Sequence, residues 1–189
     1  MIKKLCFIAI SILVFGFNSS FAQNKSEDME MQVNIPKQSG LEIRTFKVTG
    51  KTWTPAGGLE FSDLTFNQET GVITSDSYYV IEVGINSNAE NWSINHGTKS
   101  ISNQDSNLDN NINVSFVKQK DADNGDLLEK VSFANSNNKS ISKTQLGGGW
   151  LRIYYGLATG KDDAPGVIPL TSSKTSGKYS GEVHITLTE

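Results

Sequence analysis

The side chains that most often carry acid–base or metal chemistry are sparse in this chain. His96 and His184 are its only histidines. Neither belongs to an H-x-H or H-E-x-x-H spacing, and a single ligand does not make a metal site. No G-x-S-x-G nucleophile elbow occurs, and no glycine-rich loop leads into a predicted helix. We therefore predict that both histidines face solvent and that the protein is not an enzyme and holds no metal or cofactor.

Residues 121–126 (D-A-D-N-G-D) form the one segment with the composition of a calcium loop. An EF-hand needs glycine at its sixth position and glutamate at its twelfth. Counted from Asp121, those positions hold Asp126 and Ser132, so the segment does not match. Asn124-Gly125 is instead a turn signal that predicts the tip of a β-hairpin. A weak calcium site of another type is the alternative for this loop.

Aromatic residues suggest a second kind of chemistry, the stacking of sugars. Trp and Tyr combine a large apolar ring with a polar group, which suits a partly wet binding surface. Trp92, Trp150 and Tyr154 are the candidates for such a glycan platform. In the pair Tyr154-Tyr155, the alternation of a strand sends one ring inward and the other outward. The alternative is that these rings serve only the core and cross-strand packing.

The elements that would position a site are strands, and the clearest lies in residues 178–189 (K-Y-S-G-E-V-H-I-T-L-T-E). Every second residue of this segment points to one face, and those residues are mostly apolar. A period of two predicts a long strand with one wet face. Such a strand must pair with its own sheet or with a partner. The residues of the apolar face are Tyr179, Gly181, Val183, Ile185 and Leu187.

The remainder of the chain has the same character. Short alternating runs recur between turn-rich segments, and no helical period follows residue 22. About nine or ten strands predict an all-β protein, an immunoglobulin-like antiparallel β-sandwich over residues 29–189. The polar residues 99–111 are predicted to be a loop. The apolar phase changes between Ile43 and Phe46, which predicts a β-bulge.

Residues 1–22 have the parts of a secretory signal peptide. Two lysines precede an apolar stretch over residues 5–17, and Ser20-Phe21-Ala22 suits a signal peptidase. The apolar stretch is too short to span a bilayer comfortably, and no later segment resembles a transmembrane helix. We therefore expect a bacterial, Sec-type signal cleaved before Gln23, followed by a disordered tail over residues 23–28.

Cysteine content and charge limit the classes of partner. Cys6, the only cysteine of the 189 residues, lies in the signal, so the mature chain can form no disulfide. The full chain has a net charge of −3. Loss of Lys3 and Lys4 with the signal changes it to about −5. No basic stripe is visible, so nucleic acid is not predicted as a partner.

Four features together resemble bacterial fimbrial (pilus) subunits and the spore-coat-U-like secreted β-sandwich proteins. They are the signal, the V-N-I-P…L-E-I pair of strands, W-S-I after a long central strand, and the closing G-K-Y-S-G-E-V-H-I-T-L-T. The resemblance implies an immunoglobulin-like fold and a structural protein. In the assembled members, an N-terminal strand from a neighbour completes the sheet of each subunit. The chain departs from many of them by lacking a cysteine pair.

This resemblance implies a donor strand over residues 29–36 and a groove beside the final strand. The donor side chains would be Met29, Met31, Val33 and Ile35, and the groove residues Tyr179, Val183, Ile185 and Leu187. Partners would be copies of the chain or related subunits, with a periplasmic chaperone, at the cell surface or in the periplasm. Two alternatives stay open. Residues 29–35 pair within their own domain in a closed monomer, or the protein is a self-contained secreted module that binds glycans.

Overall fold

The computed structural model describes residues 39–104 and 106–189, and these residues are almost entirely strands and turns. The predicted signal peptide, the tail and residues 29–36 lie outside them. One 3-10 turn, η1 (Ala134–Ser136), and one helical turn, α1 (Lys143–Leu146), interrupt the strands. The strands are β1 (Ser39–Thr49), β2 (Thr52–Pro55), β3 (Leu64–Phe66), β4 (Val72–Ser75), β5 (Ser77–Ser87), β6 (Ser93–Asn103), β7 (Ser106–Asn107), β8 (Ile112–Gln119), β9 (Gly125–Ser132), β10 (Lys139–Ser142), β11 (Trp150–Leu157), β12 (Leu170–Thr171) and β13 (Ser180–Thr188).

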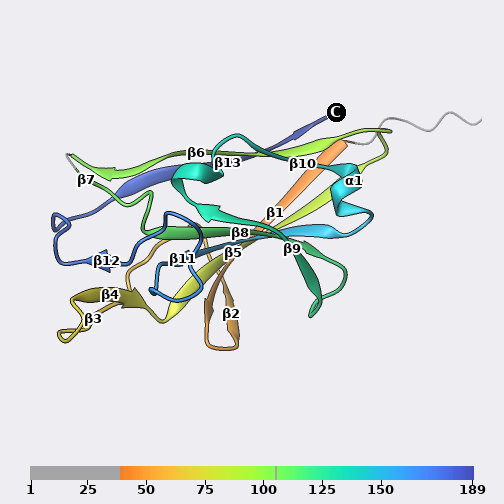
Figure 1. The fold of residues 1–189 in the computed structure, drawn as a ribbon. Helices are drawn as coiled ribbons and strands as arrows, with labels where there is room; N and C mark the ends of the chain where they lie inside the picture. Colours follow the sequence, from red (N-terminus) through yellow and green to blue (C-terminus); the bar gives the residue numbers. More distant parts are fainter. Residues whose placement is uncertain (1–38, 105) are drawn as a thin grey trace, which may run out of the picture. The chain divides into compact units, whose positions relative to one another are not determined.

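The strands form two layers and a small third sheet. The larger layer has the order β2-β1-β5-β11-β8-β9, and the smaller has the order β10-β6-β13, with β7 also paired to β6. Figure 1 shows β6 and β13 running above β8, β5 and β11. A short sheet, β12-β4-β3, lies at one end, and all pairings are antiparallel. The predicted all-β antiparallel sandwich is confirmed.

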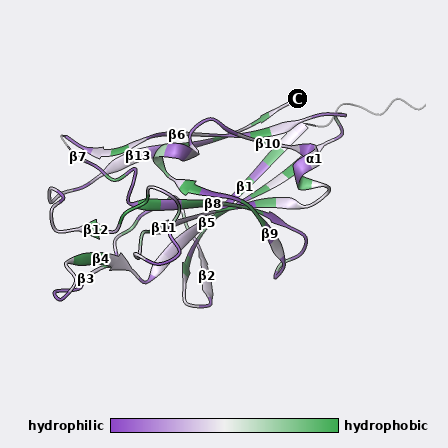
Figure 2. Ribbon diagram, in the orientation of Figure 1, coloured by the Kyte–Doolittle hydropathy of each residue, from purple (hydrophilic) through white to green (hydrophobic). Residues whose placement is uncertain are grey.

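The core lies between the two layers and follows from alternation along the strands. Tyr79, Ile81 and Val83 of β5 face Ile94 of the other layer, and all four are buried in one cluster. Figure 2 shows the hydrophobic colour along β8, whereas β9, at the sheet edge, is largely hydrophilic. Because a strand sends successive side chains to opposite faces, each layer keeps one polar or half-covered face outward.

The predicted bulge in β1 is wrong. β1 pairs with β5 in one continuous register, from Ser39 opposite Ser87 to Thr49 opposite Ser77. The apolar phase changes because the two halves of the strand are covered on different faces. Leu41 packs against the core, whereas Val48 is fully buried on the opposite face of the sheet, outside the core cluster. The alternation therefore switches faces without any extra residue.

The predicted loop over residues 99–111 is also partly wrong. β6 continues to Asn103, and β7 (Ser106–Asn107) pairs back onto it. These strands are polar because much of this end of β6 is exposed. The predicted hairpin is present, but its turn is formed by residues 120–124, because Gly125 already belongs to β9 and lies opposite Gln119 of β8.

The glycines before β11 end a helical turn that the sequence did not predict. Ser142 caps α1 in a capping box with Gln145, and Gly147 follows in the left-handed conformation at φ 52°. Gly149 then approaches the neighbouring strand closely, since a Cβ there would lie 2.2 Å from the backbone oxygen of Gln119. Gly149 is thus a steric requirement of the β8–β11 pairing and not a flexible linker.

Replacing Gly149 with alanine is expected to lower the free energy of unfolding by about 1–3 kcal/mol, because the clash is with backbone that cannot rotate away. Chemical denaturation measures this. Gly57→Ala is the matched control, because a Cβ at Gly57 meets nothing within 4 Å. Equal stability of the two variants would contradict the close approach.

Candidate functional site

The final strand lies at an edge of its sheet. Among the described strands, β13 pairs only with β6, so its second edge has no partner strand there. An edge strand presents a row of N–H and C=O groups that can template another strand, and natural proteins usually cover or interrupt such an edge. β13 is nine residues long. A nine-residue strand offers much more edge than the short strands that commonly end a sheet.

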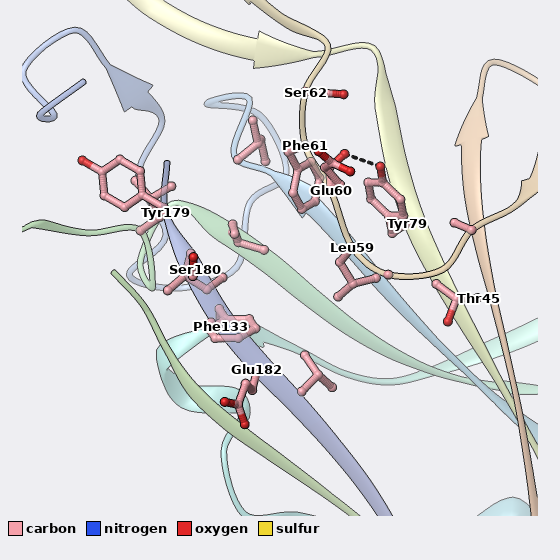
Figure 3. Close-up of a pocket in the computed structure, with 18 of the residues that line it drawn as sticks. Thr45, Leu59, Glu60, Phe61, Ser62, Tyr79, Phe133, Tyr179, Ser180 and Glu182 are labelled. Carbon is pink, nitrogen blue, oxygen red and sulfur yellow. Dashed lines mark hydrogen bonds between the residues drawn. The ribbon is translucent and has the colours of Figure 1, made fainter. Parts of the chain in front are cut away.

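A cavity of about 1040 Å³ lies next to β13 and opens between the two layers. We call it the β13 groove. Figure 3 shows Tyr179 and the β13 residues Ser180 and Glu182 on one side, and Leu59, Phe61 and Tyr79 on the other. Ligand pockets in proteins commonly measure about 300–1,000 Å³, so this cavity is slightly larger than that range.

The wall opposite β13 is residues 56–62, which follow β2 without forming a strand. The backbone N–H of Ala56 donates to the oxygen of Thr45 at 2.9 Å, and the hydroxyl of Tyr79 donates to the oxygen of Glu60. The Phe61 ring packs edge-on against Tyr79, with centroids 5.1 Å apart. One backbone hydrogen bond and the contacts of the Tyr79 side chain thus hold this wall in place, without a sheet ladder.

The groove has an apolar floor and an apolar mouth. Phe133 and Ile81 of its lining are buried. At the mouth, Ile43 and Leu64 are 45% and 47% exposed. These large aliphatic side chains leave the mouth of the groove partly apolar and open to water. The geometry suits an extended peptide whose alternate side chains point inward.

The structure brings together most of the predicted groove residues. Tyr179, Val183 and Ile185 line the cavity. Leu187 is half-buried opposite Ile94 and is not part of the lining. The predicted donor residues Met29, Met31, Val33 and Ile35 lie outside the described residues. Sequence reasoning missed the wall at residues 56–62, although the alternation of Leu59 and Phe61 was visible as a short apolar run.

The polar side chains of β13 form a charged cluster around Glu182, which also belongs to the lining of the groove. Lys99 of β6 lies 2.8 Å from the Glu182 carboxylate, and the Nε2 atom of His184 lies 2.9 Å from it. The Lys99 ammonium holds the pKa of Glu182 below its usual range. These side chains are about half exposed, so the cluster adds little stability.

The prediction that both histidines face solvent is wrong for one of them. His184 is exposed as predicted, but His96 is buried with 1% of its surface exposed. Its Nδ1 atom lies 2.8 Å from the backbone oxygen of Ser136, and its Nε2 atom lies 2.7 Å from the Tyr155 hydroxyl. Because a carbonyl only accepts, Nδ1 carries the proton and Nε2 accepts from Tyr155. His96 is therefore a satisfied core residue.

The acidic loop is built as a turn. Both carboxylate oxygens of Asp121 accept hydrogen bonds from the Asn124 side chain, and one also accepts from the backbone of Asp123 and Asn124. Residues 39–104 and 106–189 contain no group of three His, Cys, Asp or Glu side chains placed to hold a metal ion. In the same part of the chain, no helix is long and apolar enough to cross a membrane.

The three aromatic candidates do not form one platform. Trp150 and Tyr154 alternate on the outer face of β11, away from the core. Trp92 is half-buried before β6 and packs against the core cluster. The residues that do join Trp150 and Tyr154 on that face are Trp53 and Tyr78, whose places depend on pairings of β1, β2, β5 and β11 that the sequence alone does not reveal.

Comparison with known proteins adds no family. No protein-family model, curated protein or solved structure matches this chain.

The buried histidine makes stability depend on pH. Burial lowers the pKa of His96 from its ordinary value of 6.5. The unfolded chain therefore binds a proton that the folded chain resists, and stability falls as the pH drops below about 6.5. We expect a loss of up to about 1.4 kcal/mol per pH unit between pH 6.5 and 5, measured by denaturation.

Two variants isolate this effect. His96→Gln should remove most of the slope over this interval, whereas His184→Gln should keep it, because His184 is exposed. Carboxylates with lowered pKa values, such as Asp121, contribute only at more acidic pH. Identical stability of the unmodified chain at pH 7 and pH 5 would contradict the buried, neutral His96.

Proposed function

We propose that the protein is an exported structural subunit that assembles by β-strand addition, with the β13 groove accepting residues 29–35 of another copy. One observation carries this proposal: an edge strand without a partner in the described part of the chain borders a cavity of about 1040 Å³ whose lining includes many apolar side chains. An added strand fills both at once, because its main chain pairs with the edge while alternate side chains enter the cavity.

The sequence of residues 29–35 fits this occupant. Met29, Met31, Val33 and Ile35 alternate with Glu30, Gln32 and Asn34, so an extended chain places all four apolar side chains on one face. Seven extended residues span about 23 Å at 3.3 Å per residue, which is shorter than the roughly 30 Å of β13. The polar side chains would then join Glu182 and His184 on the wet face.

The energetics require both parts of the contact. Burying four such side chains contributes roughly 6–12 kcal/mol, at about 1.5–3 kcal/mol each. Association costs about 4–15 kcal/mol in lost freedom, so side-chain burial alone does little more than balance it. Main-chain hydrogen bonds along β13 add about 0.5–1.5 kcal/mol each and decide the outcome. A cavity without the free edge would bind such a segment weakly.

Chain length favours a neighbour as the source of the strand. Ser39, the start of β1, pairs with Ser87, whose hydroxyl lies 2.6 Å from the Glu189 carboxylate at the end of β13. Residue 35 can lie at most about 14 Å from Ser39. A chain's own segment could therefore reach the groove only by running parallel to β13. A segment from another copy can also run antiparallel, which is the slightly more stable pairing.

The remaining parts of the proposal follow from the sequence. The signal at residues 1–22 supports export to the periplasm or the cell surface. The resemblance to fimbrial subunits supports assembly into a polymer and a periplasmic chaperone that protects the groove beforehand. We infer a non-catalytic role, because the described lining of the groove combines apolar side chains, such as Phe61 and Val183, with scattered polar ones and suits the side chains of a strand better than a reaction.

Engineered cysteines test the contact, since the chain from Gln23 onward contains none of its own. Asn34→Cys is combined in turn with Glu182→Cys, His184→Cys and Thr186→Cys. Three pairs are used because the proposal does not fix which residue of β13 lies opposite Asn34. Opposite residues of paired strands place their Cβ atoms about 4.5–5.5 Å apart, close enough for a disulfide after small adjustments. Oxidation should give disulfide-linked oligomers for at least one pair, visible on a non-reducing gel.

The control places the second cysteine at Ser140, which is exposed on β10 at the other edge of the same sheet. That pair should yield no ladder of oligomers. A disulfide formed only within single chains would instead support the closed monomer and contradict assembly. Equal cross-linking through Ser140 would contradict the choice of the β13 edge.

A further inference from the structure

We propose that the outer face of the larger sheet is a second binding site, and that it takes a chain of sugar residues. This outer aromatic face consists of Trp53, Tyr78, Trp150, Arg152 and Tyr154. Pairing fixes their common side: Val48 lies opposite both Trp53 and Tyr78, and Val80 lies opposite Tyr154. Residues directly opposite each other in paired strands share a face.

The rings form a layer above buried valines. Val48 and Val80 are both fully buried, yet neither belongs to the core cluster between the sheets. The aromatic side chains above them are only partly buried, and Trp53 is 37% exposed. Tyr78 and Tyr154 lie side by side, with ring centroids 6.1 Å apart. The face is thus a fixed aromatic surface that remains open to solvent.

Arg152 holds the two indole rings in place. Its guanidinium lies 4.9 Å from the Trp53 ring and 5.9 Å from the Trp150 ring. Glu82 binds its Nε and Nη2 atoms at 2.8 and 2.7 Å, and Nη1 donates to the oxygen of Ala122. The Arg152 and Glu82 side chains are only 11% and 12% exposed. Arg152 is therefore a positioning residue, and the rings are the contact surface.

The polar groups on this face favour a hydroxyl-rich ligand. The hydroxyls of Tyr78 and Tyr154, whose ring centroids lie 6.1 Å apart, make no hydrogen bond with any described residue. An apolar partner would cover these donors without satisfying them, which is unfavourable. A sugar chain offers hydroxyl oxygens to them and apolar ring faces to the aromatic side chains. An extended sugar chain can also lie flat along the face of a sheet.

This site is separate from the β13 groove. The groove borders the inner face of the larger sheet, where Tyr79 and Ile81 point, whereas Tyr78 and Val80 point the other way. Occupation of one site therefore leaves the other open. An assembled subunit could display the outer aromatic face along a polymer, where many weak contacts to a polysaccharide would add up.

Titration of the chain from Gln23 with cellohexaose, chitohexaose and hexagalacturonate tests the proposal, followed by calorimetry and tryptophan fluorescence. We expect saturable binding of at least one of the three. Trp53→Ala should weaken it about tenfold or more, as aromatic contacts of this kind do. Arg152→Met should also weaken it, because the indole rings lose the group between them.

Phe66→Ala is the matched control, since Phe66 is a comparably exposed aromatic residue on β3, 48% exposed, outside this face. It should leave binding unchanged. Absence of saturable binding by all three sugars, or equal loss in Phe66→Ala and Trp53→Ala, would overturn the proposal. Neither result depends on strand addition, because binding is measured per chain whether or not the cysteine pairs at β13 cross-link.

Discussion

The unpaired edge of β13 is the constraint on which the rest of the structure depends. Backbone N–H and C=O groups must find partners when they leave water, and within the described residues β13 offers one side of its main chain to none. The groove beside it adds apolar side chains that are open to water, with Ile43 and Leu64 half exposed at its mouth. One extended segment could pair with the edge and also fill the groove. A single added strand therefore meets them together.

The two faces of the larger sheet carry different surfaces. Its inner face supplies the core and the floor of the groove through residues such as Tyr79 and Ile81. Its outer face carries the aromatic layer over Val48 and Val80, fixed by the pair Arg152–Glu82. β1 serves both, because its first half faces the core and its second half the aromatic layer. β1 therefore contributes residues to both surfaces.

Much of the local structure could be predicted from sequence, because alternation reports strands directly. β11, β13 and the hairpin of β8 and β9 appear where the pattern placed them, although the turn of the hairpin is longer than Asn124-Gly125 alone predicts. Alternation does not say which face of a strand is covered. For this reason the sequence predicts an exposed His96 and a bulge in β1, and both predictions are wrong. Which strands pair is a long-range property. It separates Trp92 from Trp150 and brings residues 56–62, which belong to no strand, into the wall of the groove.

Hydrogen–deuterium exchange across residues 180–188 tests the central claim most directly. The chain from Gln23 is compared with one that begins at Lys37, over a range of protein concentrations. If another copy supplies the strand, β13 exchanges slowly in the longer chain, increasingly so at higher concentration, and quickly in the shorter chain, while β8 stays protected in both. Equal exchange of β13 in the two chains, or protection that does not change with concentration, would contradict assembly through this edge.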